Sequence, residues 1–163
     1  MIRPATISDA PAIAAVYNPY IAATTISFEE APVSDYEMAE RIKGVTANLP
    51  WYVFEADGKV VGYAYATPWR TRCAYRLSVE TSVYISTDYP RRGIGTQLYR
   101  TLLDDLRQRG ITVVIGGIAL PNAASVALHE RMGFEKVAHF KKVGRKFDRW
   151  IDVGYWEYLM NDD

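Results

Sequence analysis

The chain has 163 residues, of which 49% are hydrophobic, and its nineteen Lys and Arg residues balance nineteen Asp and Glu residues. This length fits one domain over residues 1–163 with one substantial buried core. Balanced charge excludes a general attraction to nucleic acid or to anionic membranes, so we expect neither as a partner. Cys73 is the single cysteine, which excludes an internal disulfide, and with only His129 and His139 beside it we expect no metal site.

The N-terminal segment has no apolar stretch of the kind that a secretory signal needs. No run approaches the ~20 apolar residues that a membrane-spanning helix requires. We therefore expect a soluble, cytoplasmic protein.

The first third of the chain predicts one strand and two helices. Residues 2–5 form the expected strand, and Ser8 and Asp9 can cap a helix that Pro19 should disturb. A second helix is expected over about residues 34–48. The side chains expected to face the core are Ile13, Val16, Tyr17 and Tyr20 in the first helix, and Met38, Ile42 and Val45 in the second.

The remaining chain predicts strands with two further helices between them. Asp57 and Gly58 are a turn dipeptide between two strand-like runs, 51–56 and 59–66. Residues 79–85 alternate as a strand, with Glu80 on the opposite face from Val79. The other expected elements are a helix ending before Gly110, a strand over 112–118, a helix over 122–132, and a strand pair over 136–143 and 150–159. These elements predict an α/β fold with a mixed sheet and helices on both faces.

A short basic glycine turn separates the strand at 79–85 from the long helix that follows. Gly93 and Gly95 permit close approach of the backbone to a ligand, and Arg91 and Arg92 add permanent positive charge. The unpaired amides of a helix start favour a phosphate or diphosphate. Neither a mononucleotide P-loop nor a complete dinucleotide-binding GxGxxG is present. The alternative is an ordinary turn with exposed arginines.

The helix expected from Asn122 carries a polar stripe. Residues three and seven positions after Asn122 return close to the same helix face, which groups Asn122, Ser125 and His129. The alternative is a helix cap at Asn122 and a histidine satisfied at the surface.

Residues 83–96 and 122–134 together resemble the two acetyl-CoA signatures of the GCN5-related N-acetyltransferase (GNAT) superfamily. Residues 68–70, 80–85 and 144–156 resemble its phosphinothricin and methionine sulfoximine acetyltransferase branch, and the likeness extends over nearly the whole chain. The resemblance implies a GNAT-like, mostly antiparallel central sheet with helices on both faces. It also implies acetyl-CoA as co-substrate, with cofactor-binding residues Val83, Ile85, Arg91, Arg92, Gly93, Ile94, Gly95, Thr96, Asn122 and Ser125.

Acetyl transfer from a thioester to an amine requires a deprotonated amine, a polarised carbonyl and a leaving thiolate. Glu80 is the expected general base, acting through water, and the resemblance indicates the same residue. The alternative is a solvated strand carboxylate. His129 can hold the amine, share the base role or protonate the thiolate. No covalent intermediate is needed, and Cys73 is expected to serve packing.

The resemblance places Arg70, Arg72 and Tyr75 around the acidic end of the substrate, and Phe28 in a wall of the acceptor pocket. A guanidinium binds a carboxylate or phosphinate through paired hydrogen bonds better than Lys does. The alternatives are solvent-exposed arginines and a core phenylalanine.

One feature of the glycine turn departs from the superfamily pattern. Pro90 stands where the superfamily usually has Gln or Arg, and Pro lacks the backbone N–H that can contact a diphosphate. The basic run at residues 141–146 favours a nucleic-acid site only weakly, because Asp148 and Asp152 interrupt its charge. We prefer to interpret this basic run as a solvated strand edge, or as a contact at a dimer interface and at the mouth of the cofactor site.

The sequence therefore predicts an N-acetyltransferase acting on the α-amine of a small amino acid or analogue of the phosphinothricin, methionine sulfoximine or methionine sulfone type. The resemblance also implies a homodimer. Two alternatives remain: the same chemistry on a polyamine, an aminoglycoside or a protein N-terminus, and a non-catalytic sensor that binds acyl-CoA. Arg70 and Arg72 argue against cationic acceptors, because like charges repel.

Overall fold

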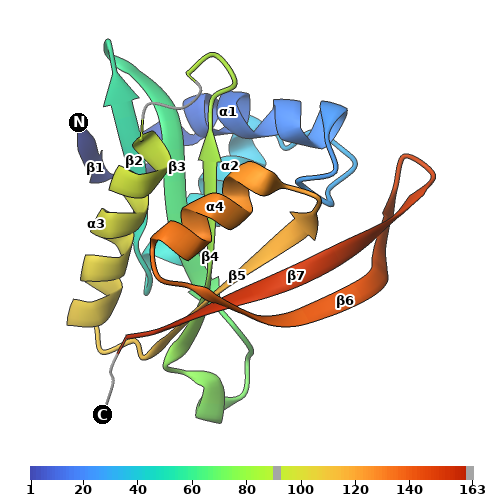
Figure 1. The fold of residues 1–163 in the computed structure, drawn as a ribbon. Coiled ribbons are helices and arrows are strands. Elements are labelled where there is room, and N and C mark those ends of the chain that lie inside the picture. The colour runs from blue at the N-terminus through green and yellow to red at the C-terminus, as the bar shows by residue number, and fades with distance from the viewer. Residues whose placement is uncertain (90–92, 161–163) are drawn as a thin grey trace.

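The structure is a computed structural model that describes residues 1–89 and 93–160. Its centre is a seven-stranded sheet in the order β1-β2-β3-β4-β5-β7-β6, in which β4 and β5 are parallel and the other neighbours are antiparallel (Figure 1). The mixed, mostly antiparallel α/β fold is confirmed. The strands are β1 Ile2–Pro4, β2 Trp51–Ala56, β3 Lys59–Pro68, β4 Ser78–Ile85, β5 Val113–Leu120, β6 Glu135–Lys146 and β7 Arg149–Leu159.

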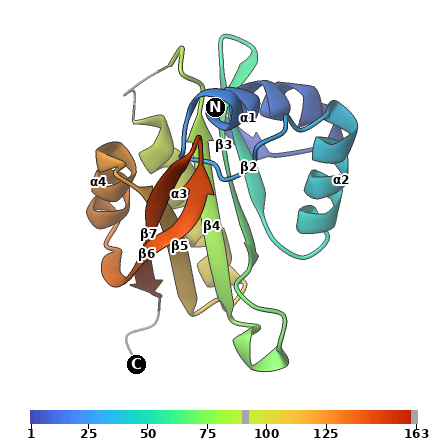
Figure 2. The same cartoon turned by 90° about the vertical axis from the view of Figure 1, so that its right-hand side faces the viewer.

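Helices cover both faces of the sheet (Figure 2). The helices α1 Ala10–Ala23 and α2 Asp35–Thr46 lie on one face, where Ile13, Met38 and Ile42 are almost completely buried. The other face carries α3 Ile94–Gln108 and α4 Ala123–Arg131, and the apolar side of α3 forms its core. In the described part of the chain, no helix is long and apolar enough to cross a membrane.

The prediction that Pro19 disturbs the first helix is wrong, because α1 continues through it to Ala23. A proline inside a helix removes the hydrogen bond to the carbonyl four residues earlier, here that of Ala15. Ala15 and Pro19 both lie on the exposed side of α1, where water can hydrate that carbonyl. The buried side chains of Tyr17 and Ile21 hold the last turns against the sheet.

The predicted hairpin at residues 51–66 is confirmed, with Tyr65 opposite Trp51 and Tyr63 opposite Val53. Asp57 and Gly58 have φ angles of 51° and 71°. Two successive left-handed residues give the tight turn that suits the twist of antiparallel strands.

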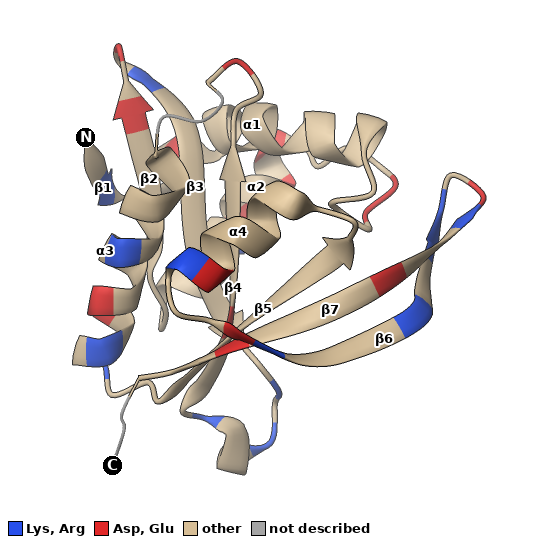
Figure 3. Ribbon diagram, viewed as in Figure 1, with Lys and Arg blue, Asp and Glu red and all other residues tan. Residues whose placement is uncertain are grey.

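The last two strands form a long hairpin that extends away from the rest of the sheet (Figure 1). Strand β6 reaches Lys146, three residues beyond the predicted end, and its pairing register shifts between Phe140 and Gly144. Figure 3 shows basic and acidic residues interspersed along this hairpin. The prediction of a solvated edge is wrong for Lys146, which is only 3% exposed.

Candidate active site

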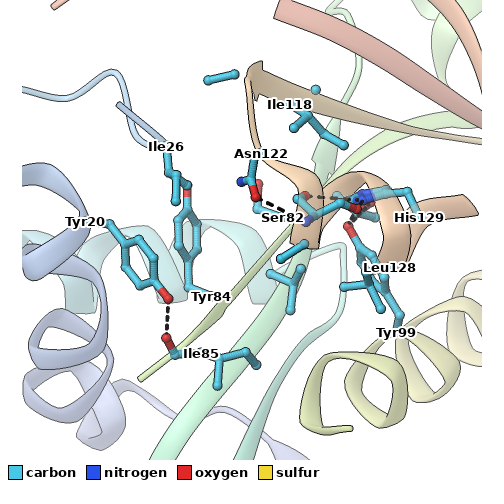
Figure 4. Close-up of a pocket in the computed structure, with 16 residues that line it drawn as sticks. Tyr20, Ile26, Ser82, Tyr84, Ile85, Tyr99, Ile118, Asn122, Leu128 and His129 are labelled. Atoms are coloured by element: carbon cyan, nitrogen blue, oxygen red, sulfur yellow. Dashed lines mark hydrogen bonds between the residues drawn. The ribbon is translucent and has the colours of Figure 1, made fainter. Parts of the chain in front are cut away.

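The strands β4 and β5 separate part of the way along the sheet. They pair only from Ser78 opposite Val113 to Glu80 opposite Ile115. Beyond these pairs β4 remains bonded to β3 and β5 to β7, so their facing edges leave backbone groups available to a ligand. A cavity of about 250 Å³ lies at this opening. Val83 and Ile85, both predicted to bind the cofactor, line it, and the carbonyl of Ile85 also accepts a hydrogen bond from Tyr20 (Figure 4).

The glycine turn leads into α3 as the sequence predicts. Gly93 is the N-cap of α3 and has a φ of 69°, a left-handed conformation that favours glycine. Gly95 faces α4 so closely that a methyl group there would lie 3.1 Å from Leu128 Cδ2. Ile94 is buried in the core beside this turn, and Thr96 is half-buried in the first turn of α3. Pro90, Arg91 and Arg92 lie outside the described residues.

Helix α4 positions the predicted polar stripe at the opening. The side-chain oxygen of Asn122 accepts a hydrogen bond of 3.2 Å from the backbone N–H of Ser125, which caps the helix. Asn122, Ser125 and His129 line the same cavity (Figure 4). His129 is only 3% exposed, so it is not a surface histidine.

Both ring nitrogens of His129 have hydrogen-bond partners. Nδ1 lies 2.7 Å from the backbone carbonyl of Ser125, and Nε2 lies 2.8 Å from the hydroxyl of Tyr99. Because a carbonyl oxygen only accepts, Nδ1 carries the proton and Tyr99 donates to Nε2. Burial lowers the pKa of His129, which favours the neutral ring. Thr81 lies 3.3 Å from the Tyr99 hydroxyl and extends this polar chain.

Consecutive glycines on β5 leave room for the two predicted catalytic side chains on opposite faces. A methyl group at Gly116 would lie 2.5 Å from His129 Nε2, and one at Gly117 would lie 3.1 Å from Glu80 Oε1. Successive residues of a strand point to opposite faces. His129 therefore lies on the face covered by α3 and α4, whereas Glu80 lies on the face covered by α1 and α2.

A second cavity, of about 430 Å³, lies on the Glu80 side. Phe28, predicted to form a pocket wall, lines it together with Glu80. Burial raises the pKa of Glu80, and the positive charge of Arg70 opposes that rise. The two cavities meet at the opening in the sheet, where they share Ile26, Ser82, Tyr84, Gly117 and Ala119.

The predicted substrate-binding residues between β3 and β4 occupy different places. The guanidinium of Arg70 lies 4.4 Å above the ring of Trp69, whose edge meets Tyr155 in the Glu80 cavity. Arg72 instead lines a separate hollow that Arg70 also borders. Tyr75 is 41% exposed and lines none of these cavities.

Three residues of the site were not predicted from the sequence: Tyr99, Tyr155 and Glu29. Tyr99 falls within the apolar stripe of α3 and is fully buried, and a buried tyrosine hydroxyl normally needs a partner, which is the signal available in the sequence. Glu29 lines the Glu80 cavity and receives hydrogen bonds from Tyr17 and Arg41. Nothing in the local sequence indicates that Glu29 would line the same cavity as Glu80.

Comparisons with known proteins place this architecture in a family. The model of the acetyltransferase (GNAT) domain matches residues 2–154. The chain is 42% identical to the phosphinothricin N-acetyltransferase of Alcaligenes faecalis, over 98% of this chain and 82% of the relative. It is 37% identical to the L-methionine sulfoximine/L-methionine sulfone acetyltransferase of Pseudomonas paraeruginosa, over 98% of this chain and 94% of the relative.

Solved structures give the same result. A GNAT superfamily phosphinothricin acetyltransferase from Sinorhizobium meliloti, crystallised in complex with acetyl-CoA, superposes with a TM-score of 0.95 at 34% identity. The superposition covers 99% of this chain and 89% of that one. The chain therefore belongs to the GNAT family of acetyltransferases.

Proposed function

We propose that this enzyme transfers the acetyl group of acetyl-CoA to the α-amine of a small amino acid or analogue, of the phosphinothricin, methionine sulfoximine or methionine sulfone type. The observation that carries the proposal is the opening between β4 and β5, with a buried carboxylate on one face and the His129–Tyr99 pair on the other. Family membership and the names of the relatives support the same reaction.

The cavity on the α3 and α4 side suits acetyl-CoA. Its walls combine the edge of β4 that does not pair with β5, at Val83 and Ile85, with Asn122 and Ser125 of α4. The nearby N-terminus of α3, entered through left-handed Gly93, suits a diphosphate. When bound, acetyl-CoA supplies the thioester whose acetyl group is transferred.

Glu80 is the proposed general base. Burial raises its pKa above the ordinary 4.5, which brings the carboxylate closer to the basicity needed near neutral pH. It accepts a proton from the α-ammonium through a water molecule, and the neutral nitrogen then attacks the acetyl carbon. The C–S bond then breaks. The nitrogen loses its second proton, the thiolate gains one, and the coenzyme leaves as the free thiol. No covalent enzyme intermediate is required.

His129 and Tyr99 act on the opposite face, where the sulfur leaves. Burial keeps the imidazole neutral and also raises the pKa of Tyr99, so both groups remain uncharged near neutral pH. Before the reaction, Tyr99 donates its single O–H proton to His129 Nε2, and this hydrogen bond holds the hydroxyl in place. The proposed step is that the hydroxyl turns and donates instead to the sulfur as the thiolate develops. The proposal therefore gives Glu80 and His129 separate roles.

Arg70 is the proposed partner for the acidic end of the acceptor. Its charge already acts on Glu80 and on Tyr155, so it lies within electrostatic reach of the acceptor cavity. Arg72 and Tyr75 remain predictions from the resemblance, together with Arg91 and Arg92 at the diphosphate.

The test is release of free thiol from acetyl-CoA with phosphinothricin, methionine sulfoximine and methionine sulfone as acceptors. Spermidine, kanamycin and an alanine-initiated peptide serve as the contrasting acceptors. Turnover confined to the amino-acid analogues supports the proposal, and preference for a contrasting acceptor contradicts the substrate class. Acetyl-CoA binding without turnover on any acceptor is the result expected of a sensor.

We also propose a cytoplasmic homodimer. Along the β6–β7 hairpin, the large apolar side chains of Phe140, Val143, Phe147 and Trp150 are between 52% and 60% exposed, which favours a protein contact. The prediction that Cys73 serves packing is wrong, because this residue is exposed, and its free thiol suits a reducing compartment. Sedimentation of the native chain and of Trp150→Glu tests the assembly: a dimer that dissociates in the variant supports it, and a native monomer contradicts it.

A further inference from the structure

A buried lysine connects the C-terminal hairpin to the acceptor cavity. Lys146, the last residue of β6, donates hydrogen bonds of 2.7 Å to the backbone carbonyls of Ile21 and Ser27. Ile21 lies in the last turns of α1, and Ser27 lies in the loop that follows α1. The ammonium group therefore fixes both ends of residues 21–27, although it comes from more than a hundred positions later in the chain.

The segment held by Lys146 forms one side of the acceptor cavity. Ile26, Ser27, Phe28 and Glu29 all line the cavity that contains Glu80. A second contact from the same hairpin reinforces this arrangement, because a methyl group at Gly144 would overlap the ring of Phe28. The absence of a side chain at Gly144 is what allows the Phe28 ring to pack directly against β6.

Lys146 is a buried lysine and not a solvated surface residue. The side chain is buried, and burial lowers its pKa, although Glu30 and Glu29 oppose that effect. Its two hydrogen-bond partners are neutral carbonyls, which do not compensate a buried charge as a carboxylate would. Burying the ammonium group costs free energy, and its main structural effect is to orient the carbonyls of Ile21 and Ser27.

We infer that Lys146 and Gly144 are positioning residues that hold loop 24–29 in the shape that binds the acceptor. The inference rests on the proposed function, because it takes the Glu80 cavity as the acceptor site. It assigns the C-terminal hairpin chiefly to acceptor affinity, because Ser27, Phe28 and Glu29 line only the Glu80 cavity, whereas Ile26 lines both cavities.

The first test compares Lys146→Met, which keeps the aliphatic stem and removes the ammonium, with Lys141→Met on an exposed position of the same hairpin. We expect the acceptor KM to rise about tenfold in Lys146→Met, because two buried carbonyls lose their donor. The KM for acetyl-CoA and kcat should remain within about threefold of the native values. An unchanged acceptor KM, or an equal rise in both KM values, overturns the inference.

A second test uses the contact between Gly144 and Phe28. Gly144→Ala should raise the acceptor KM by displacing the ring, and the same substitution should have no further effect in a Phe28→Ala background. An effect of Gly144→Ala that persists without the Phe28 ring contradicts the positioning role.

Amide hydrogen exchange separates this inference from the proposed substrate class, because it needs no acceptor. Residues 24–29 should exchange faster in Lys146→Met than in the native protein and in Lys141→Met. If no amino acid is turned over but this acceleration appears, the proposed substrates are wrong and the positioning role stands. If turnover occurs and exchange of the loop is unchanged, the positioning role is wrong.

Discussion

At the scale of single residues, His129 is defined by what holds its two ring nitrogens. The Ser125 carbonyl accepts a hydrogen bond from the Nδ1–H, and Tyr99 donates to Nε2 from a position on α3. The sequence groups Asn122, Ser125 and His129 correctly, because all three lie on one helix with regular spacing. It does not reveal Tyr99, because that partner comes from another helix and depends on packing.

Tyr99→Phe tests this pair. Removal of the hydroxyl takes away the donor that favours a neutral Nε2, so we expect the pKa of His129 to rise. We also expect kcat to fall about 10- to 100-fold if the hydroxyl assists the leaving sulfur. NMR titration of His129 and steady-state kinetics measure the two effects, with Tyr36→Phe on the exposed surface of α2 as control. An unchanged histidine titration would disprove the hydrogen-bond role.

The depressed pKa of His129 also predicts how stability depends on pH. The unfolded chain takes up a proton near the ordinary pKa of 6.5, whereas the folded chain resists protonation at this site until lower pH. The free energy of unfolding should therefore fall as pH drops below about 6.5. Urea unfolding at pH 7.5 and 5.5 measures the change. His129→Gln should show a smaller pH-dependent loss than the native protein, and an equal loss contradicts the assignment.

At the scale of elements, β5 separates the two halves of the site through adjacent glycines. We expect Gly116→Ala to displace His129 and to destabilise the fold by about 1–3 kcal/mol, because its methyl group meets a buried ring. In Gly117→Ala the added methyl group would lie 3.1 Å from Glu80 and from Tyr155, which is less severe than the 2.5 Å contact at Gly116. This variant should chiefly raise the acceptor KM, because it displaces Glu80 and Tyr155. Thermal unfolding and kinetics distinguish the two variants.

Gly44→Ala in α2 is the matched control for these glycine variants. No atom lies near a methyl group placed there, so alanine should stabilise the helix by about 0.5–1 kcal/mol without altering kinetics. If Gly116→Ala leaves stability and kinetics as Gly44→Ala does, the close packing of His129 on β5 is contradicted.

Element identities were largely predictable from the sequence, because their signals are local. The Asp57–Gly58 turn, the alternation along β4 and the apolar stripe of α3 each indicate their own conformation. The separation of β4 from β5 has no such local signal, since it depends on which strands each one pairs with. That separation joins the cavity beside Glu80 to the cavity beside His129, and it required the structure.

At the scale of the whole molecule, the opening in the sheet joins two cavities that lie on opposite faces. The helices α3 and α4 border the cavity that suits acetyl-CoA, and the segment after α1 borders the acceptor cavity. The C-terminal hairpin reaches back to that segment through Lys146. In the proposed mechanism the reacting groups therefore meet through the sheet, with Glu80 as the base on the acceptor side.

The pH dependence of kcat/KM for the amino-acid acceptor, compared between the native enzyme and Glu80→Gln, tests this central claim most directly. A base whose pKa is raised by burial must lose its proton to act, so the native rate should rise with pH through a pKa above the ordinary 4.5. The variant should lose about 10²- to 10⁴-fold in rate and lack that acidic limb, with its KM for acetyl-CoA unchanged. A variant that keeps the native rate and the same acidic limb would contradict the account.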